Sequence, residues 1–158
     1  MNALVVYYSR TGITRQVARD LAQRLDADTE ELADSKRRGG PWGWLSGVRD
    51  ALARKLRPIG ALAHTPEDYD LVLVGTPVWA NTMSTAVRAF LSDHGARLRA
   101  AGWFCTLAGK DPAHTFDDMT ALSGQTPHGT LAVRAKDVKA GRHVAAVDAF
   151  AHSLAGDA

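Results

Sequence analysis

The chain has 158 residues, a net charge of +2 and a single cysteine, a length at which one domain buries about two thirds of its unfolded surface. One cysteine excludes an internal disulfide and is consistent with a cytoplasmic location, and a chain of this size needs no metal to stabilise its core. No apolar run reaches the roughly 20 residues that span a bilayer, and Arg10 interrupts the first apolar stretch, so we expect one soluble domain over residues 1–158 without a signal peptide.

Residues 4–25 predict a strand, a short loop and a helix in immediate succession. The run from Leu4 to Tyr8 is short, apolar and rich in β-branched and aromatic residues, which indicates a strand buried on both faces of a parallel sheet. The helix is indicated by apolar residues spaced four apart, with mostly polar residues between them: Ile13, Val17, Leu21 and Leu25.

The loop between this strand and helix holds three hydroxyl residues, Ser9, Thr11 and Thr14, together with Arg10 and Gly12. Amide groups at a helix start point outward with the positive end of the helix dipole, and hydroxyls add further donors, so the loop indicates a phosphate site. The alternative is a simple helix cap, which needs only one hydroxyl. The chain has no GxxxxGK[ST] or GxGxxG motif, and the loop has no cysteine, so we expect it to hold a phosphate without cleaving it. The Arg10 side chain could neutralise that phosphate or point outward.

A short second strand is expected over residues 29–32, and a basic segment follows at residues 36–57. This segment holds seven basic residues and one acidic residue, a local charge of +6. Its apolar residues follow a helical spacing, so one interpretation is an ordinary helix with a solvated basic face. The other is a docking surface for an acidic redox partner, an anionic substrate or a membrane carrying quinone. Nucleic acid is not expected, because no recognition motif accompanies the charge.

The third strand is predicted over residues 71–75 and ends at Thr76-Pro77-Val78-Trp79. Trp79 lies beyond the strand, where little core is available, and its ring is suited to stack on a flat, electron-poor heterocycle. Packing against a neighbouring helix is the alternative. Asn81 and Thr82 could hydrogen-bond the same ligand or cap the next helix.

The rest of the chain continues to alternate helices with strands, which predicts a parallel sheet covered by helices on both faces. In such sheets a ligand lies beyond the carboxyl ends of the strands. Cys105 falls within an apolar strand and is expected to be a small buried hydrophobe, not a redox thiol. The expected elements are a helix over 84–94, a strand over 103–107, a helix over 115–122, a strand over 129–133 and a helix over 144–154.

Two stretches of the chain resemble the flavodoxin family. Tyr8-Ser9-Arg10-Thr11-Gly12-Ile13-Thr14 is similar to the Ser/Thr-x-Thr-Gly-x-Thr loop that grips the phosphate of FMN in that family. The stretch from Leu71 to Trp79 resembles the family's third strand and the loop after it, where an aromatic side chain covers one face of the isoalloxazine. The resemblance implies an α/β fold, a flavodoxin-like three-layer α/β/α sandwich whose five-stranded parallel sheet has the order 2-1-3-4-5, with FMN bound noncovalently.

The resemblance also implies which residues bind the cofactor. The loop after the fourth strand would contact the flavin: Gly109 permits close backbone approach, and Lys110 could stabilise the anionic reduced flavin. This loop lacks the aromatic residue that many flavodoxins have, so we expect one ring face to be open to a substrate or partner. His114 could relay a proton or simply be solvated. No catalytic residue and no metal ligand is assigned. The expected FMN-binding residues are Ser9, Arg10, Thr11, Gly12, Ile13, Thr14, Thr76, Pro77, Val78, Trp79, Asn81, Thr82, Thr106, Ala108, Gly109 and Lys110.

Three functions are consistent with these residues. The favoured one is an electron carrier that passes electrons through FMN to a redox partner protein. The second is an enzyme on the same scaffold, an FMN-dependent oxidoreductase that uses NAD(P)H or a quinone. Within that class the basic segment also resembles flavodoxin-like protoporphyrinogen oxidases, although the long additional segment of those proteins is not evident. The third is a flavin-free binding or regulatory domain.

Overall fold

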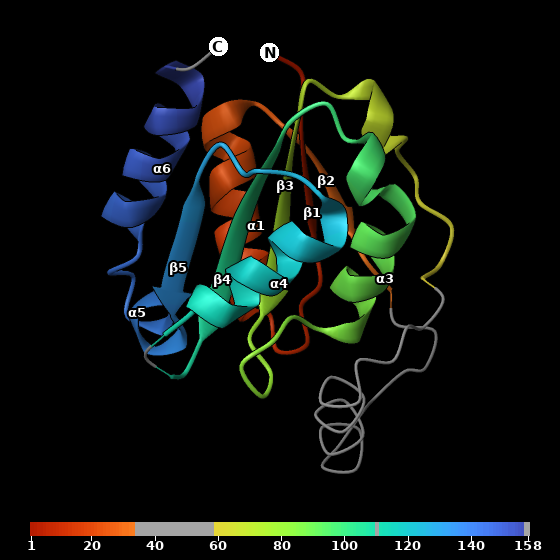
Figure 1. Cartoon of the computed structure of the whole chain (residues 1–158). Helices are drawn as coiled ribbons and strands as arrows, with labels where there is room; N and C mark the ends of the chain where they lie inside the picture. Colours follow the sequence, from red (N-terminus) through yellow and green to blue (C-terminus); the bar gives the residue numbers. More distant parts are fainter. Residues whose placement is uncertain (34–58, 110, 157–158) are drawn as a thin grey trace.

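Five parallel strands form one sheet in the order β2-β1-β3-β4-β5 in the computed structural model, which describes residues 1–33, 59–109 and 111–156 (Figure 1). The expected fold class and strand order are therefore confirmed. The order places β1 and β3 side by side although α1 and β2 separate them in the sequence. The strands are β1 (Ala3–Tyr7), β2 (Asp28–Glu31), β3 (Leu71–Pro77), β4 (Ala101–Leu107) and β5 (Thr130–Arg134).

The three inner strands are buried along nearly their whole length, whereas the two edge strands are not. Every residue of β1 and β4 is buried, and in β3 only Pro77 is partly exposed. In β5 exposed and buried residues alternate, as expected for an edge strand with one face on the core. The continuous apolar runs that predicted these inner strands therefore correspond to burial on both faces of the sheet.

Helices cover both faces of the sheet, which gives three layers (Figure 1). One core lies under α1, α5 and α6 and includes Val17, Leu21 and Val147. The other lies under α3 and α4 and includes Phe90 and Met119. None of the helices in the described parts of the chain is both long and apolar enough to cross a membrane. The helices are α1 (Ile13–Leu25), α3 (Thr85–His94), α4 (Ala113–Ser123), α5 (Ala135–Lys139) and α6 (Val144–Gly156), with short 3-10 helices at Pro66–Asp68 and Gly95–Arg97.

Outside residues 36–57 the expected elements are all present, and that basic segment lies wholly outside the described residues. Helix α1 has the expected bounds, and the other elements differ by a few residues at their ends. Helix α5, which follows β5 directly at Ala135, was not expected from the sequence. Its five residues are too short for an apolar stripe to show a helical period.

Cys105 lies in the middle of β4 with its side chain fully buried, as expected from the sequence. Burial raises the pKa of the Cys105 thiol to about 12, so that the reactive thiolate makes up only about one part in 10,000 at pH 8. We expect a disulfide reagent at pH 8 to modify the folded protein at least about 1,000-fold more slowly than the protein in denaturant. Rapid modification of the folded protein would show that β4 opens readily.

Candidate functional site

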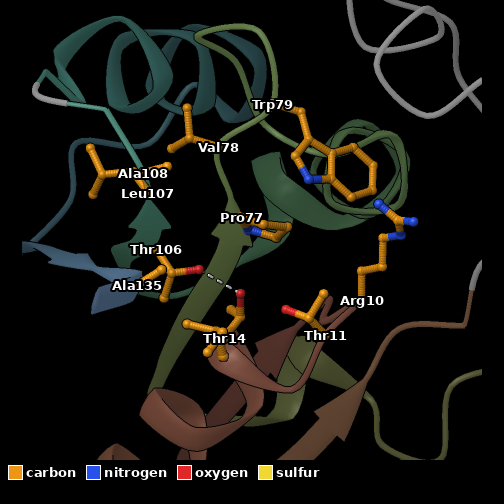
Figure 2. A pocket seen from close by; sticks show the side chains of 11 residues that line it. Arg10, Thr11, Thr14, Pro77, Val78, Trp79, Thr106, Leu107, Ala108 and Ala135 are labelled. Carbon is orange, nitrogen blue, oxygen red and sulfur yellow. Dashed lines mark hydrogen bonds between the residues drawn. The ribbon is translucent and has the colours of Figure 1, made fainter. Parts of the chain in front are cut away.

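A cavity of about 180 Å³ opens at the carboxyl ends of β1, β3 and β4 (Figure 2). A second cavity of about 220 Å³ adjoins it and shares Val78, Leu107 and Ala108 with it. Together they bring segments from three loops to one edge of the sheet. The first is lined by Arg10, Thr11, Ile13, Thr14, Pro77, Val78, Trp79, Thr106, Leu107, Ala108 and Ala135, and the second adds Ala80, Asn81, Gly109 and Asp111.

Residues 9–14, where the sequence predicts a phosphate site and which we call the phosphate loop, lead into helix α1, whose N-cap residue is Gly12. Gly12 has φ 90° and ψ −7°, a left-handed conformation that a residue with a side chain rarely adopts. The Ser9 hydroxyl accepts hydrogen bonds from the amides of Gly12 (3.1 Å) and Arg15 (3.2 Å). Its own hydrogen remains available to donate. The Ser9 hydroxyl therefore links the start of the loop to the first turn of α1, and its hydrogen is still able to bond a ligand.

Three further amides of this loop are available to an anion. The N–H groups of Thr11, Ile13 and Thr14 make no hydrogen bond within the part of the chain that the structure describes. They precede the first hydrogen bond of the helix, which the amide of Gln16 donates to the Gly12 carbonyl (3.0 Å). Free amides at a helix start, together with the helix dipole, form an anion site. Arg10 is the one charged side chain among the described residues that line the first cavity.

A pair of hydroxyls joins the phosphate loop to the sheet. The Thr14 and Thr106 Oγ1 atoms lie 2.7 Å apart, and both side chains are buried (Figure 2). Because the pair shares a single hydrogen, the other hydroxyl hydrogen is left to donate elsewhere. Thr106 thereby holds Thr14 in place at the floor of the cavity and also lines it.

Trp79 lies at the cavity on a tight turn, and it also packs against the buried core that lies under α3 and α4. Its ring packs edge-on against Tyr8, with the ring centroids 5.5 Å apart at 85°. Figure 2 shows the Arg10 side chain extending from the phosphate loop towards the indole. The indole is only partly buried, so one side of it remains able to contact a ligand.

The turn that carries Trp79, residues 79–82, is closed by two backbone hydrogen bonds. The Trp79 amide donates to the Thr82 carbonyl (2.9 Å), and the Thr82 amide donates to the Trp79 carbonyl (3.0 Å). The two residues between them, Ala80 (φ 49°) and Asn81 (φ 60°), both have left-handed backbones, the signature of a type I′ turn. Asparagine tolerates this conformation, whereas alanine adopts it only with strain.

The strain at Ala80 gives a testable expectation. Replacing this exposed alanine with valine should lower the free energy of unfolding by about 1 to 2 kcal/mol, because a β-branched residue fits a positive φ poorly. Ala80→Asn should leave stability within about 0.5 kcal/mol of the wild type, since asparagine tolerates this backbone. Urea denaturation of both variants measures the difference. Equal stabilities would show that the turn does not have this backbone in solution.

Of the expected site residues that the structure describes, four line neither cavity: Ser9, Gly12, Thr76 and Thr82. The Thr76 hydroxyl donates to the Pro77 carbonyl (2.9 Å) and accepts from the Ser84 amide (2.9 Å). The Thr82 hydroxyl donates to Asp118 (2.6 Å). Both threonines are buried. They connect the loop after β3 to the helices α3 and α4 that support it.

Among the described residues, the loop after β4 brings Ala108, Gly109 and Asp111 to the second cavity, and none of them is aromatic. Lys110 lies outside the described residues. His114 is largely exposed at the start of α4, with its Nε2 atom 3.9 Å from an Asp118 oxygen. His114 lines neither cavity, so this geometry gives no support for a proton relay through it.

Solved structures match this chain, whereas no protein-family model and no curated protein matches it. A flavoprotein from Lactobacillus acidophilus in complex with FMN aligns with a TM-score of 0.72 and 20% identity over 88% of this chain and 97% of that chain. Oxidised flavodoxin 2 from Bacillus cereus aligns over 100% of both chains, with a TM-score of 0.60 and 14% identity. An NADH:FMN oxidoreductase in its apo form aligns over 97% of this chain and 90% of that chain, with a TM-score of 0.52 and 17% identity. The chain has the flavodoxin-like fold.

Four residues that line the two cavities were not expected from the sequence: Leu107 and Ala135 at the first, and Ala80 and Asp111 at the second. Leu107 ends β4, and Ala135 begins α5 directly after β5. In a flavodoxin-like sheet the carboxyl ends of neighbouring strands share one edge, so the end of the fifth strand was the available signal for Ala135.

An ion-pair cluster beside the phosphate loop was also missed. Arg15 pairs with Glu31 through two hydrogen bonds (2.6 and 2.9 Å), and the Tyr7 hydroxyl donates to the same carboxylate (3.2 Å). Burial and the nearby Glu31 charge raise the pKa of Tyr7. The cluster ties the end of β2 to the start of α1. Among the described residues, no group of three or more His, Cys, Asp or Glu side chains could hold a metal ion.

Proposed function

We propose that this protein binds one FMN noncovalently and transfers electrons through it. The observation that carries the proposal is the convergence, at one cavity, of an anion site and an aromatic ring: the free amides of the phosphate loop and the exposed side of Trp79. A ligand that spans both needs a phosphate at one end and a flat heterocycle at the other, and FMN has both. When bound, FMN supplies one- and two-electron transfer.

The residues of the cavity fit distinct parts of FMN. The amides of Thr11, Ile13 and Thr14 would bind the phosphate, with Arg10 to neutralise its charge. Trp79 would cover one face of the isoalloxazine. Asn81 and Gly109, from the second cavity, would lie near the edge of the ring. Thr76 and Thr82 would act indirectly, by holding the loop after β3.

Within this function we favour an electron carrier with a redox protein as its partner. Flavodoxin 2 from Bacillus cereus matches the whole chain in fold. With the carrier function we also propose a single domain over residues 1–158 and a cytoplasmic location. We further propose that the basic segment, residues 36–57, is a docking surface for the partner. None of them is needed for FMN binding itself.

An FMN-dependent oxidoreductase is the second candidate, and a specific observation favours it. Among the described residues, the end of β4 and the loop after it bring Leu107, Ala108, Gly109 and Asp111 to the second cavity, none of them aromatic, so that side of a bound flavin would have no stacking ring over it. An uncovered face admits a hydride donor such as NAD(P)H or a quinone acceptor. The NADH:FMN oxidoreductase among the matching structures has the same fold.

An anaerobic reduction experiment tests both candidates. The purified chain with one equivalent of FMN should show the visible flavin spectrum of a protein-bound chromophore. On mixing with NADPH or NADH, a carrier keeps this spectrum over minutes, whereas an oxidoreductase bleaches it at about 1 s⁻¹ or faster. A chain that retains no flavin on gel filtration would refute the proposal and favour a flavin-free binding domain.

A further inference from the structure

A buried charged network lies behind the Trp79 turn, outside both cavities. Arg88 of α3 donates through Nη2 to the Thr82 hydroxyl (2.8 Å), and the same nitrogen lies 3.4 Å from an Asp118 oxygen of α4. The Thr82 hydroxyl donates to that oxygen (2.6 Å). The Arg88 and Asp118 side chains are only 8% and 15% exposed. The three groups form a closed triangle of hydrogen bonds around one threonine.

Burying this charged network between α3 and α4 costs free energy. A buried ion pair loses the hydration of both charges, and apolar residues of similar volume often stabilise a fold as well or better. The Nε atom of Arg88 is buried and has no hydrogen-bond partner among the described residues, which adds to the cost. What the charged pair provides, and apolar residues cannot, is a fixed position for the Thr82 hydroxyl.

Fixing Thr82 fixes the turn that carries the indole. Both hydrogen bonds that close the turn run between Trp79 and Thr82. Between these residues the backbone of Ala80 is strained, and strained conformations persist only where the surrounding structure enforces them. The turn follows the end of β3, and Thr82 pairs with Trp79 across it. Contacts that fix the position of Thr82 therefore also fix the position of Trp79.

We propose that Arg88 and Asp118 are positioning residues for the cofactor site, which act through Thr82 to hold Trp79 in its stacking position. This inference rests on the proposed function for its effect on flavin binding. Its effect on the turn itself does not require a flavin. Among the described residues, His114 also faces the network, with its Nε2 atom 3.9 Å from an Asp118 oxygen.

The decisive variant is Thr82→Val, which keeps the side-chain shape, removes the hydroxyl and leaves Arg88 and Asp118 in place. The matched control is Thr115→Val. Thr115 is equally buried, lies one helical turn from Asp118 on α4, and has a hydroxyl with no hydrogen-bond partner among the described residues. Amide hydrogen exchange of the full chain by NMR, with and without FMN, reports on the turn directly.

We expect Thr82→Val to speed exchange of the Trp79 and Thr82 amides about tenfold in the flavin-free chain, while the amides of β3 stay protected. FMN and riboflavin should lose affinity by the same factor, about tenfold, because the ring site and not the phosphate site is loosened. Thr115→Val should change neither. Asp118→Asn keeps an acceptor oxygen but loses the charge, and we expect it to have an intermediate effect on both measurements. If Thr82→Val does not fold, Asp118→Asn takes its place in the experiment.

Unchanged exchange at Trp79 and Thr82 in Thr82→Val would overturn the inference, as would an affinity loss confined to FMN or an equal effect of Thr115→Val. The failure of the proposed function looks different. In that case the wild-type chain binds neither flavin, and the amide exchange of the flavin-free chain still decides whether Arg88 and Asp118 hold the turn.

Discussion

Replacing Trp79 with alanine is expected to weaken FMN binding about 30- to 150-fold, which corresponds to about 2 to 3 kcal/mol. A stacked indole buries a large apolar area on both partners, and alanine retains almost none of it. Riboflavin, which lacks the phosphate, should lose affinity by the same factor, because Trp79 is proposed to contact the ring and not the phosphate. Fluorescence titration of the two flavins measures both losses.

A matched variant separates stacking from a general disturbance of the turn. Trp79→Phe keeps an aromatic face at the same position and should bind FMN within about fivefold of the wild type. The free energy of unfolding should change little in either variant relative to the loss of affinity, since Trp79 is only partly buried. Equal affinity of Trp79→Ala and the wild type would remove the indole from the flavin site.

Gly75→Ala is expected to have the largest effect on stability, a loss of about 3 kcal/mol or more. Gly75 lies on β3 directly across from Phe104 of β4, and a Cβ atom at Gly75 would overlap the Phe104 ring. Both residues are buried in the centre of the sheet, where neither strand can move aside easily. Urea denaturation measures the loss. Gly109→Ala is the control, since a Cβ there meets no atom within 4 Å.

The cause of this loss can be tested by compensation. Phe104→Leu removes the ring atoms that a Cβ at Gly75 would meet, and alone it should cost about 1 to 2 kcal/mol through the space left behind. The double variant should be more stable than the sum of the two single losses implies, by at least about 1 kcal/mol. Additive losses would show that Gly75 is needed for its backbone and not for the space that Phe104 fills.

The sequence could predict the fold because its signals were local and repeated. The apolar run at Leu4 to Tyr8 and the four-residue spacing from Ile13 to Leu25 each defined an element and its order in the chain. The parallel sheet followed from the alternation of such elements, and the structure confirms it. Burial of Cys105 was predicted on the same basis and is also confirmed.

The sequence could also bring the loops of the site to one edge of the sheet, but it could not decide where single hydroxyls point. Thr14 and Thr106 are 92 positions apart, and their bond depends on the three-dimensional register of α1 against β4. Thr82 could equally have faced the cavity, and only the positions of Arg88 and Asp118 on two different helices turn it away. Hydrogen bonds between residues so far apart in the chain produce no repeating pattern in the sequence, so they cannot be predicted from it.

The turn at Ala80 shows another limit. A type I′ turn is normally predicted from glycine or asparagine at both central positions, and here one of them is alanine. The local sequence therefore gave no indication of the tight turn that presents Trp79. Its conformation is set by residues packed behind it.

The central claim is that one site binds both the phosphate and the ring of FMN, and calorimetric titration with FMN and riboflavin tests it most directly. We expect the wild-type chain to bind FMN at least about 100-fold more tightly than riboflavin, through charge-assisted bonds in the phosphate loop. The Thr11→Ala/Thr14→Ala variant keeps the loop amides and Arg10 but loses two hydroxyl donors, so its preference for FMN should fall about tenfold while its riboflavin affinity stays the same. Equal affinity of the wild type for the two flavins, or an equal loss for both in the variant, would contradict the account.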